Sequence, residues 1–503
     1  MYKKNTPVII GAAQITQRKD VDHPLDPLTL IANASRKAIV MLGVDGLRDF
    51  VDTLYMSTIS SWSYEDASEK LSDLLGIKPV QKHIAPISGN TPQLLVNKAA
   101  RAISLNENKV ILIAGGEAAY SKYRADKGNI TLDWPELPTT TINKMQEATN
   151  YYSSKFEVSY KLTAARYIYA LIETALRAES DRSLKEHLDS IGKRYERFSK
   201  IASENPYAWE QNPYNAKEII TPNSNNRIIC HPYTKRMVAN LYVDQAAALI
   251  ITNEKIATNL GIDRKNWVYP MGGADLNNIR YITQRPRLYN SPAIREVSKL
   301  ALKQAGLKLS EIDAFDLYSC FPCMVEIAQQ EIGIPEDDPR DLTITGGLSF
   351  FGGPLSSYSM HPIVTGIELI RKKPNMKIMI LANGGFNTSE SIGIYGSEPP
   401  AKAWTRQVPN DIQQKIESEV LPEPIEEANG NLTIEAYTII YDRKGLPEYG
   451  VIIGLLESGE RTLAFISEDS EKLLNLEEQE LIGKTYLIRH DSKLKRNILL
   501  IES

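Results

Sequence analysis

The sequence predicts an α/β protein that carries one structural unit twice, with a helical insert between the copies and a small all-β domain at the end. Three observations predict this fold class. A helix–strand motif recurs, a long stretch with helical periodicity separates the copies, and apolar residues alternate with polar ones near the C-terminus. A length of 503 residues suggests two or three domains.

The repeated motif begins with a helix that stops at a glycine. In the first copy the helix ends near Gly43, and a strand is expected after the aspartates at 49 and 52. In the second copy a helix is predicted for residues 291–305, Gly306 follows, and a strand is expected after the aspartates at 313 and 316. Glycine suits the position after a helix because that position favours a left-handed backbone.

The motif continues with a buried strand that ends in glycines. Residues 109–116 and 377–385 are both unbroken apolar runs of this kind, which is typical of strands covered on both faces. The interval is 66 residues from Asp49 to Gly115 and 71 residues from Asp313 to Gly384. Two motifs at nearly equal spacing indicate a duplicated α/β unit.

The insert lies between the two copies. Residues 141–205 predict helices, because the apolar residues from 164 to 176 fall at helical spacing. The Asn-Pro pairs at 205 and 212 are expected to end this region. Residues 243–251 then predict another buried strand.

The residue pattern changes after about residue 396. Residues 397–400 (SEPP) predict a linker, and residues 430–503 predict strands, with a hairpin turn at 442–445. This pattern indicates a small all-β barrel that is similar in outline to the oligonucleotide/oligosaccharide-binding (OB) type. The expected parts are 1–120 and 241–265 for the first repeat, 121–240 for the insert, 266–396 for the second repeat, 397–429 for the linker and 430–503 for the barrel.

Composition narrows the class of protein. A net charge of −4 argues against a general binder of nucleic acid, which would carry a basic surplus, and the C-terminal domain mixes both signs of charge. Three cysteines do not make a disulfide framework, so the reducing cytoplasm is the expected compartment. No stretch approaches the roughly 20 apolar residues of a membrane span.

Several motifs of this chain occur together in one known family. Residues 113–117 (IAGGE), 243–248 (VDQAAA), 318–321 (YSCF) and 346–354 (GGLSFFGGP) resemble strand ends and active-site loops of the thiolase superfamily. With 232–235 (PYTK) and the added β domain, the chain is most similar to the type-1 thiolase-like proteins. These are relatives of the sterol-carrier-protein-type thiolases and are often called acetyl-CoA acetyltransferases. The resemblance implies a five-layered αβαβα fold over about residues 5–396, with a helical loop domain as the insert.

The resemblance also shows what is missing. A thiolase attacks acyl-CoA with a cysteine thiolate, which a histidine activates, and a second acid/base moves the α-proton. The nucleophile is expected within residues 88–93, where this chain has Gly89 or Asn90. The activating histidine is replaced by Gly353, and the later cysteine falls near Asn383. Transfer through the usual thioester is therefore not expected.

Cys320 is the candidate centre of the remaining chemistry. The resemblance implies an acid/base role, and Cys320 is also a candidate nucleophile; a buried cysteine that behaves as a small hydrophobe is equally compatible with the sequence. His361 is the candidate base, provided that a loop before it lets it swing in, and a histidine without catalytic duty is the alternative. No metal site is expected.

Other candidates surround the acyl group and CoA. Tyr318 is a candidate oxyanion donor, with a packed aromatic residue as the alternative, and Asn383 is a candidate donor to an acyl oxygen. Lys235 and Arg236 are candidate phosphate contacts, although adjacent basic residues are more often a solvated surface. The remaining ligand-binding candidates are Asn90, Gly384 and Gly385.

The sequence thus predicts an acyl-CoA-dependent acyltransferase that lacks the usual nucleophile, with CoA or acyl-CoA as substrate and no tightly bound cofactor. Two alternatives stay open. One is a degenerate thiolase that binds or senses acyl-CoA without turnover, and the other is an assembly module whose C-terminal domain recruits a partner. A monomer and a homodimer are both compatible with the sequence.

Overall fold

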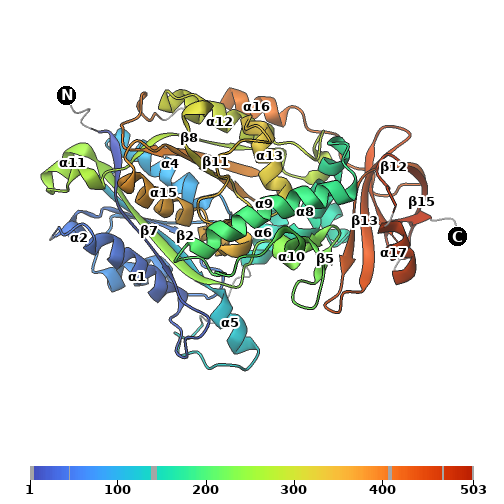
Figure 1. The fold of residues 1–503 in the computed structure, drawn as a ribbon, viewed down its shortest axis with the longest axis horizontal. Coiled ribbons are helices and arrows are strands. Elements are labelled where there is room, and N and C mark those ends of the chain that lie inside the picture. Colours follow the sequence, from blue (N-terminus) through green and yellow to red (C-terminus); the bar gives the residue numbers. More distant parts are fainter. Residues whose placement is uncertain are drawn as a thin grey trace.

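The computed structural model shows an elongated molecule with two stacked sheets and a separate group of strands at one end of its long axis (Figure 1). Within the described residues, no helix combines the length and apolarity needed to cross a bilayer. The structure describes residues 5–44, 46–137, 144–405, 410–466, 469–477 and 479–500.

The first repeat forms a sheet in the order β1-β7-β4-β2-β3. Neighbouring strands are antiparallel from β1 through β7 to β4, and they are parallel from β4 through β2 to β3. β4 and β7 are buried along their whole length, as the apolar runs predicted. The strands are β1 (Pro7–Thr16), β2 (Thr53–Ser57), β3 (Gln81–Ala85), β4 (Val110–Ala118) and β7 (Asp244–Asn253).

The second repeat forms a sheet in the order β8-β11-β10-β9, with the same succession of antiparallel and parallel pairs. The duplication is therefore confirmed, although a counterpart of β3 is absent from the part of the chain that is described. The strands are β8 (Tyr269–Asn277), β9 (Ala314–Asp316), β10 (Ile378–Gly384) and β11 (Ser389–Gly396).

The structure corrects the alignment of the two copies by three residues. Asp52 accepts a hydrogen bond from the backbone N–H of Lys109 at 2.7 Å, and Asp313 accepts the matching bond from Lys377 at 2.7 Å. Asp313 is thus the counterpart of Asp52 and not of Asp49. Asp316 lies inside β9 instead of before it, because the strand begins directly after Asp313.

Helices complete five layers, which confirms the expected fold. α4 (Thr91–Ser104) and α15 (Met360–Lys372) lie between the sheets and contact both of them. Their apolar faces pack on Ile111 and Ile378 in one shared core. The outer layers are α1 (Pro27–Val40) with α3 (Ala67–Leu75), and α12 (Pro292–Ala305) with α13 (Pro322–Ile332). α12 ends at Gly306 in a left-handed conformation, as predicted.

Helices occupy most of residues 144–204 of the insert, as predicted; residues 141–143 lie outside the described part. α8 packs against α13, beside the second repeat. The elements of the insert are α5 (Ala119–Asp126), α6 (Lys144–Tyr152), α7 (Lys155–Ser159), α8 (Ala165–Glu179), α9 (Leu184–Glu204), α10 (Ala216–Ile220), β5 (Ile228–Cys230), β6 (Tyr233–Thr234) and the 3-10 turn η1 (Lys235–Met237).

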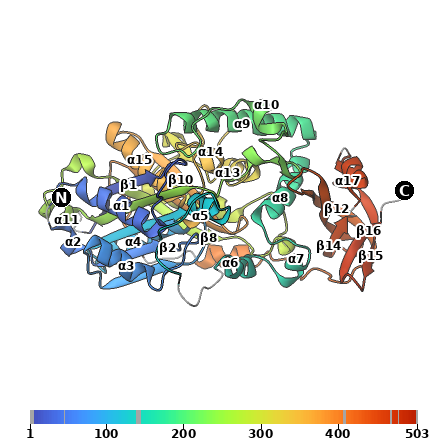
Figure 2. The ribbon, with the colours of Figure 1, turned by 90° about the horizontal axis from the view of Figure 1, so that it is seen from below.

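The C-terminal strands close a five-stranded barrel in the order β13-β14-β16-β15-β12, because β12 also pairs with β13. The barrel lies at the C-terminal end of the molecule (Figure 2). The predicted OB-like barrel and its hairpin turn at 442–445 are confirmed. β5 of the insert pairs with β12, a junction that the sequence did not predict. The elements are β12 (Gly430–Tyr441), β13 (Pro447–Leu456), β14 (Arg461–Ile466), α17 (Ser470–Glu477), β15 (Thr485–Asp491) and β16 (Arg496–Leu500).

Short elements fill the connections. The stretch 397–429, predicted as a linker, contains α16, which packs on α12 and β8; residues 406–409 lie outside the described part. The domain boundaries drawn from the sequence stay a prediction. The remaining elements are α2 (Leu47–Phe50), α11 (Glu254–Asn259), α14 (Gly347–Phe350), α16 (Asn410–Glu417) and the 3-10 turns η2 (Arg264–Asn266), η3 (Ile282–Gln284), η4 (Leu309–Glu311) and η5 (Leu355–Ser357).

Candidate active site

Three segments meet where strands of the second sheet end against the start of α4. They are the loop after β9, which carries Tyr318 and Cys320, the end of β10 at Asn383, and the loop that enters α4 at Gly89. The Asn383 amide group donates to the Cys320 sulfur at 3.8 Å. A Cβ atom added to Gly89 would overlap both the Tyr318 hydroxyl and the Asn383 carbonyl oxygen. The structure therefore brings four of the sequence-predicted positions together.

Cys320 is a buried thiol, 8% exposed, at the end of the loop that leads into α13. Burial raises the pKa of Cys320 to about 12, hydrogen bonds from Tyr169 and Asn383 oppose this rise, and the nearby carboxyl of Glu390 adds to it. The group is therefore a thiol at neutral pH. A thiol of this kind can donate a proton, but it makes a poor nucleophile because the thiolate is the attacking form.

The expected nucleophile position is occupied by another side chain. The Tyr318 ring reaches across to Gly89, and its Cζ atom lies 2.8 Å from where a Cβ atom of residue 89 would stand. Tyr318 is 6% exposed and packs edge-on against Tyr358. Burial raises the pKa of Tyr318 well above its usual value, so the hydroxyl keeps its proton. A cysteine cannot fit at residue 89 unless Tyr318 moves.

His361 is not a partner of Cys320. It lies in the first turn of α15, between the sheets, where its Nδ1 atom is 2.9 Å from Gln14 Oε1 and its ring packs near Phe351. Burial lowers its pKa to about 3. The expectation that His361 swings toward Cys320 is corrected, because residues 355–357 form the compact turn η5 and α15 fixes the ring in the core.

Asn90, Gly384 and Gly385 lie beside the site but are covered by neighbouring side chains. Asn90 donates to Ser391 at 3.0 Å and accepts from Ser88 at 2.6 Å. The Ser88 hydroxyl packs on Gly384, and the Tyr152 ring packs on Gly385, in both cases where a Cβ atom would otherwise stand. The two glycines thus permit close approach, and their role toward an acyl oxygen stays a prediction.

Lys235 and Arg236 lie in the insert, in η1. Arg236 stacks its guanidinium 3.9 Å over the ring of Tyr214 and donates to the Glu218 carbonyl at 2.9 Å, so it has a structural role. Lys235 is exposed. The chain continues from η1 to Ala239, whose N–H donates to the Cys320 carbonyl at 3.0 Å. Contact of these residues with a phosphate stays a prediction.

Sequence reasoning missed Tyr169 and Glu390. Tyr169 of α8 accepts from the Asn383 amide at 2.7 Å and stacks on Phe321, with ring centroids 4.6 Å apart. Glu390 of β11 is fully buried and acts electrostatically on both Cys320 and Tyr318. A carboxyl group near the start of a buried strand was the signal that could have identified Glu390. Tyr169 is a buried aromatic residue among the apolar residues of α8, so its pattern did not distinguish it from an ordinary core residue.

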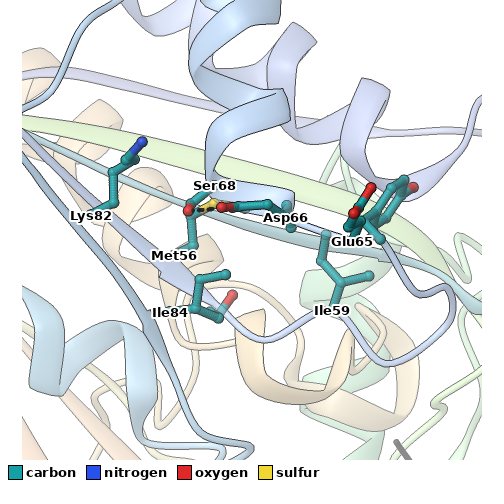
Figure 3. A pocket seen from close by; sticks show the side chains of 10 residues that line it. Met56, Ile59, Glu65, Asp66, Ser68, Lys82 and Ile84 are labelled. Carbon is teal, nitrogen blue, oxygen red and sulfur yellow. Dashed lines mark hydrogen bonds between the residues drawn. The ribbon is translucent and has the colours of Figure 1, made fainter. Parts of the chain in front are cut away.

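A pocket of about 350 Å³ lies elsewhere, between β2, α3 and β3 (Figure 3). It is lined by residues such as Met56, Ser68 and Lys82, and by none of the predicted site residues. Lys82 is ion-paired with Glu69, and Ser68 donates to Asp66 at 2.8 Å at the start of α3. Lys82, Ser68 and Asp66 of this pocket are therefore engaged in local structure.

Comparison with known proteins gives three kinds of match. The sequence profile of the "Thiolase-like protein type 1 additional C-terminal domain" matches residues 411–493. A 3-ketoacyl-CoA thiolase of Enterobacter sp. (strain 638) is 28% identical over 130 residues, which is 26% of this chain and 31% of that enzyme. Acetyl-CoA acetyltransferase 1 of Arabidopsis thaliana is 27% identical over 156 residues, covering 31% and 35% of the two chains. The chain thus matches about a third of the length of these curated relatives.

Solved structures extend the match to the whole chain. An SCP2-thiolase-like protein type 1 from Mycobacterium smegmatis, described as monomeric, is 30% identical with a TM-score of 0.86 and full coverage of both chains. The Ltp2-ChsH2(DUF35) aldolase is 18% identical with a TM-score of 0.59, covering 78% of this chain and 98% of that one. The dimeric peroxisomal thiolase of Saccharomyces cerevisiae is 15% identical with a TM-score of 0.57, covering 78% and 98%. The last two show the fold alone.

Proposed function

The chain belongs to the SCP2-thiolase-like proteins of type 1, and from that premise we propose that it binds an acyl-CoA and transfers a proton at the α-carbon of the thioester without forming an acyl-enzyme. The observation that carries this proposal is the contact of Tyr318 with Gly89, which fills the nucleophile position with a hydroxyl group. The thiolase chemistry that needs a cysteine there is lost, whereas the enolate chemistry that needs an acid and an oxyanion donor is not.

Each remaining group has a role in this chemistry. Tyr318 and Asn383 are the donors to the thioester oxygen, where negative charge gathers as the enolate forms. Cys320 is the acid: its S–H bond breaks as a C–H bond forms at the α-carbon, and the electron pair of the enolate makes the new bond. In the reverse step the thiolate form of Cys320, a small fraction at neutral pH, takes an α-proton: the C–H bond breaks, its electron pair becomes that of the enolate, and the S–H bond forms. A thiol whose pKa burial raises to about 12 is suited to hold this proton at neutral pH.

The acyltransferase predicted from the sequence then takes a non-covalent form. An enolate formed from one acyl-CoA can attack, or leave from, a second carbonyl group, so a carbon–carbon bond forms or breaks directly. One solved structure with this fold is named an aldolase, and aldol chemistry needs no acyl-enzyme. The exposed Lys235 in η1 is the proposed contact for a CoA phosphate.

A second candidate function is binding or sensing of acyl-CoA without turnover. It is favoured by the tight packing of the site, since Cys320, Tyr318 and Asn383 are 8%, 6% and 2% exposed. Recruitment of a partner by the C-terminal barrel is less favoured as a separate function. The barrel is joined to the insert through β5, so it is part of the same structure.

The test is a binding titration with CoA and acetyl-CoA, followed by intact-protein mass measurement after incubation with acetyl-CoA and acetoacetyl-CoA. The proposal predicts saturable binding of the thioesters and an unchanged protein mass. A mass gain of one acyl group that disappears in Cys320→Ala would contradict it and make Cys320 a nucleophile. Lack of binding by the folded protein would remove both candidate functions that use acyl-CoA.

A further inference from the structure

Glu390 is a buried carboxyl group without a structural partner. It stands in β11, its side chain is fully buried, and neither carboxyl oxygen has a hydrogen-bond partner among the described residues. Buried polar groups almost always have such partners, because an unpaired one costs a large desolvation penalty. Because Glu390 lies in the candidate active site and its burial destabilises the fold, a functional role is the explanation to test.

The strand register places Glu390 next to Cys320. Glu390 lies directly opposite Asn383 in the antiparallel pair of β10 and β11, so the two side chains share one face of the sheet. On that face the Asn383 amide donates to the Cys320 sulfur at 3.8 Å, and the Asn383 Oδ1 atom has no described partner. Three unpaired polar atoms are therefore gathered beside the thiol.

The titratable and charged groups that face Glu390 come from three elements. Cys320 and Tyr318 come from the loop after β9, Tyr169 from α8, and Arg285 from the residue after η3. Burial raises the pKa of Glu390 well above its usual value, and the charge of Arg285 opposes this rise.

Arg285 is itself 3% exposed, and its Nη1 atom has no described partner. Its other guanidinium nitrogens donate to backbone carbonyls and to Thr388, so the cation is fixed in place. Burial thus favours the protonated form of Glu390, and a fixed cation stands nearby. Such a cation favours the carboxylate that remains after the proton leaves.

We propose that Glu390 is the proton reservoir of the Cys320 site, a buried carboxylic acid that reprotonates Cys320 after the thiol has given its proton to a bound enolate. In this step the carboxyl O–H bond breaks and the S–H bond of Cys320 forms, which leaves a thiol and a carboxylate. Water then reprotonates the carboxylate. Glu390 acts through Cys320 and touches no substrate, and the substrate part of this inference rests on the proposed function.

The first test needs no acyl-CoA. The rate at which iodoacetamide alkylates each cysteine is measured by peptide mass spectrometry from pH 7 to pH 10.5, in the wild type and in Glu390→Gln. The wild-type carboxyl ionises first as the pH rises and then opposes ionisation of Cys320. We expect the two profiles to coincide at the lowest pH and to separate above it, with Cys320 of E390Q reacting about tenfold faster, which corresponds to about one pKa unit.

Two controls separate this coupling from loosened packing. Cys230 and Cys323 are buried thiols in the same molecule and should keep their wild-type rates. Glu117→Gln removes another fully buried carboxyl and should leave the Cys320 profile unchanged. Superimposed wild-type and E390Q profiles over the whole range would overturn the proposal, and so would faster reaction of all three cysteines in E390Q.

A second readout separates a proton reservoir from a mere neighbouring charge. In D2O, E390Q should exchange the α-protons of acetyl-CoA at least tenfold more slowly than the wild type with the same acetyl-CoA affinity, and Glu390→Asp should recover part of the rate. Equal exchange by wild type and E390Q would overturn the reservoir. If the wild type binds acetyl-CoA without exchange, the proposed function fails, and the alkylation profile still decides whether Glu390 and Cys320 are coupled.

Discussion

The two repeats of the core share one strand order, but their buried carboxyl groups differ in hydrogen bonding. In the first repeat, Glu117 of β4 accepts the backbone N–H groups of Ser60 and Ser61, each at 2.8 Å. In the second repeat, Glu390 of β11 accepts nothing from the described residues. Both groups are fully buried, and burial raises the pKa of both, that of Glu117 to about 7.

The difference shows which buried carboxyl stabilises the fold and which is available for chemistry. Glu117 ties the loop after β2 to the end of β4, so its oxygens are already used. Glu390 faces Cys320, Tyr318 and Tyr169, and neither of its carboxyl oxygens has a hydrogen-bond partner in the described part of the chain. No hydrogen bond offsets the desolvation cost of a buried polar group that lacks a partner, so such a group does not stabilise the fold. For this reason we place the chemistry in the second repeat, where Glu390 lies.

The largest expected effect concerns His361, which we assign to structure. Burial lowers its pKa to about 3, so the folded state favours the neutral ring and stability is lost as the pH falls from the unfolded pKa near 6.5. Between pH 7 and pH 4 this loss amounts to about 3 kcal/mol, and it should be absent from His361→Gln. Denaturant unfolding of both proteins at the two pH values measures it. Equal acid losses in both proteins would show that His361 is not held neutral by the fold.

The next effect concerns the contact that replaces the nucleophile. Gly89→Ala places a methyl group against the Tyr318 hydroxyl and the Asn383 carbonyl oxygen, and it should cost about 1–3 kcal/mol of unfolding free energy. Tyr318→Phe in the same chain should recover part of this cost, because it removes one of the two overlapping oxygens. The double-mutant cycle is read from denaturant unfolding. A neutral Gly89→Ala would mean that residue 89 has room for a side chain.

The two buried carboxyl groups, Glu117 and Glu390, should respond differently to substitution by glutamine. Glu117→Gln leaves one of two backbone donors without an acceptor and should cost about 1–3 kcal/mol at neutral pH. Glu390→Gln breaks no described hydrogen bond and removes the cost of burying a carboxyl that ionises in the unfolded chain at neutral pH, so it should raise the unfolding free energy. The unfolding free energies of the two variants decide this. The reverse order would assign the structural role to Glu390.

The smallest effect lies in the insert, outside both repeats. Lys235→Ala should weaken CoA binding by about threefold, and the loss should shrink at high salt, because the contact is an exposed ion pair. Arg236→Ala is the matched variant: it loses a stack on Tyr214 and should lower stability instead of affinity. Titration with CoA at two salt concentrations tests both. An unchanged affinity in Lys235→Ala would remove Lys235 from the ligand site.

Much of the fold follows from patterns in the sequence. The glycine-ended apolar runs at 109–116 and 377–385 predicted β4 and β10, and the turn at 442–445 predicted the hairpin of the barrel. Local patterns did not predict the pairing of β5 with β12, because that contact joins distant segments of the chain and β5 has only three residues. The three-residue shift between Asp49 and Asp52 was missed for a similar reason, since both aspartates precede the same strand.

The site was predicted in part. Motif spacing identified Tyr318, Cys320 and Asn383, because each lies next to a strand end that the pattern locates. His361 was misplaced because its direction depends on how α15 packs between the sheets, which spacing along the chain does not describe. Glu390 was missed because its significance lies in the hydrogen bonds that it does not make, and these are visible only when the neighbouring elements are in place.

The most direct test of the central claim is exchange of the α-protons of acetyl-CoA in D2O, followed by NMR, in the wild type and in Cys320→Ala. The account predicts that the wild type replaces these protons by deuterium while its own mass stays free of an acyl group. It also predicts that Cys320→Ala is slower by roughly a hundredfold, the usual contribution of a positioned acid or base. Equal rates in the two proteins, or no exchange by a wild type that binds acetyl-CoA, would contradict the account.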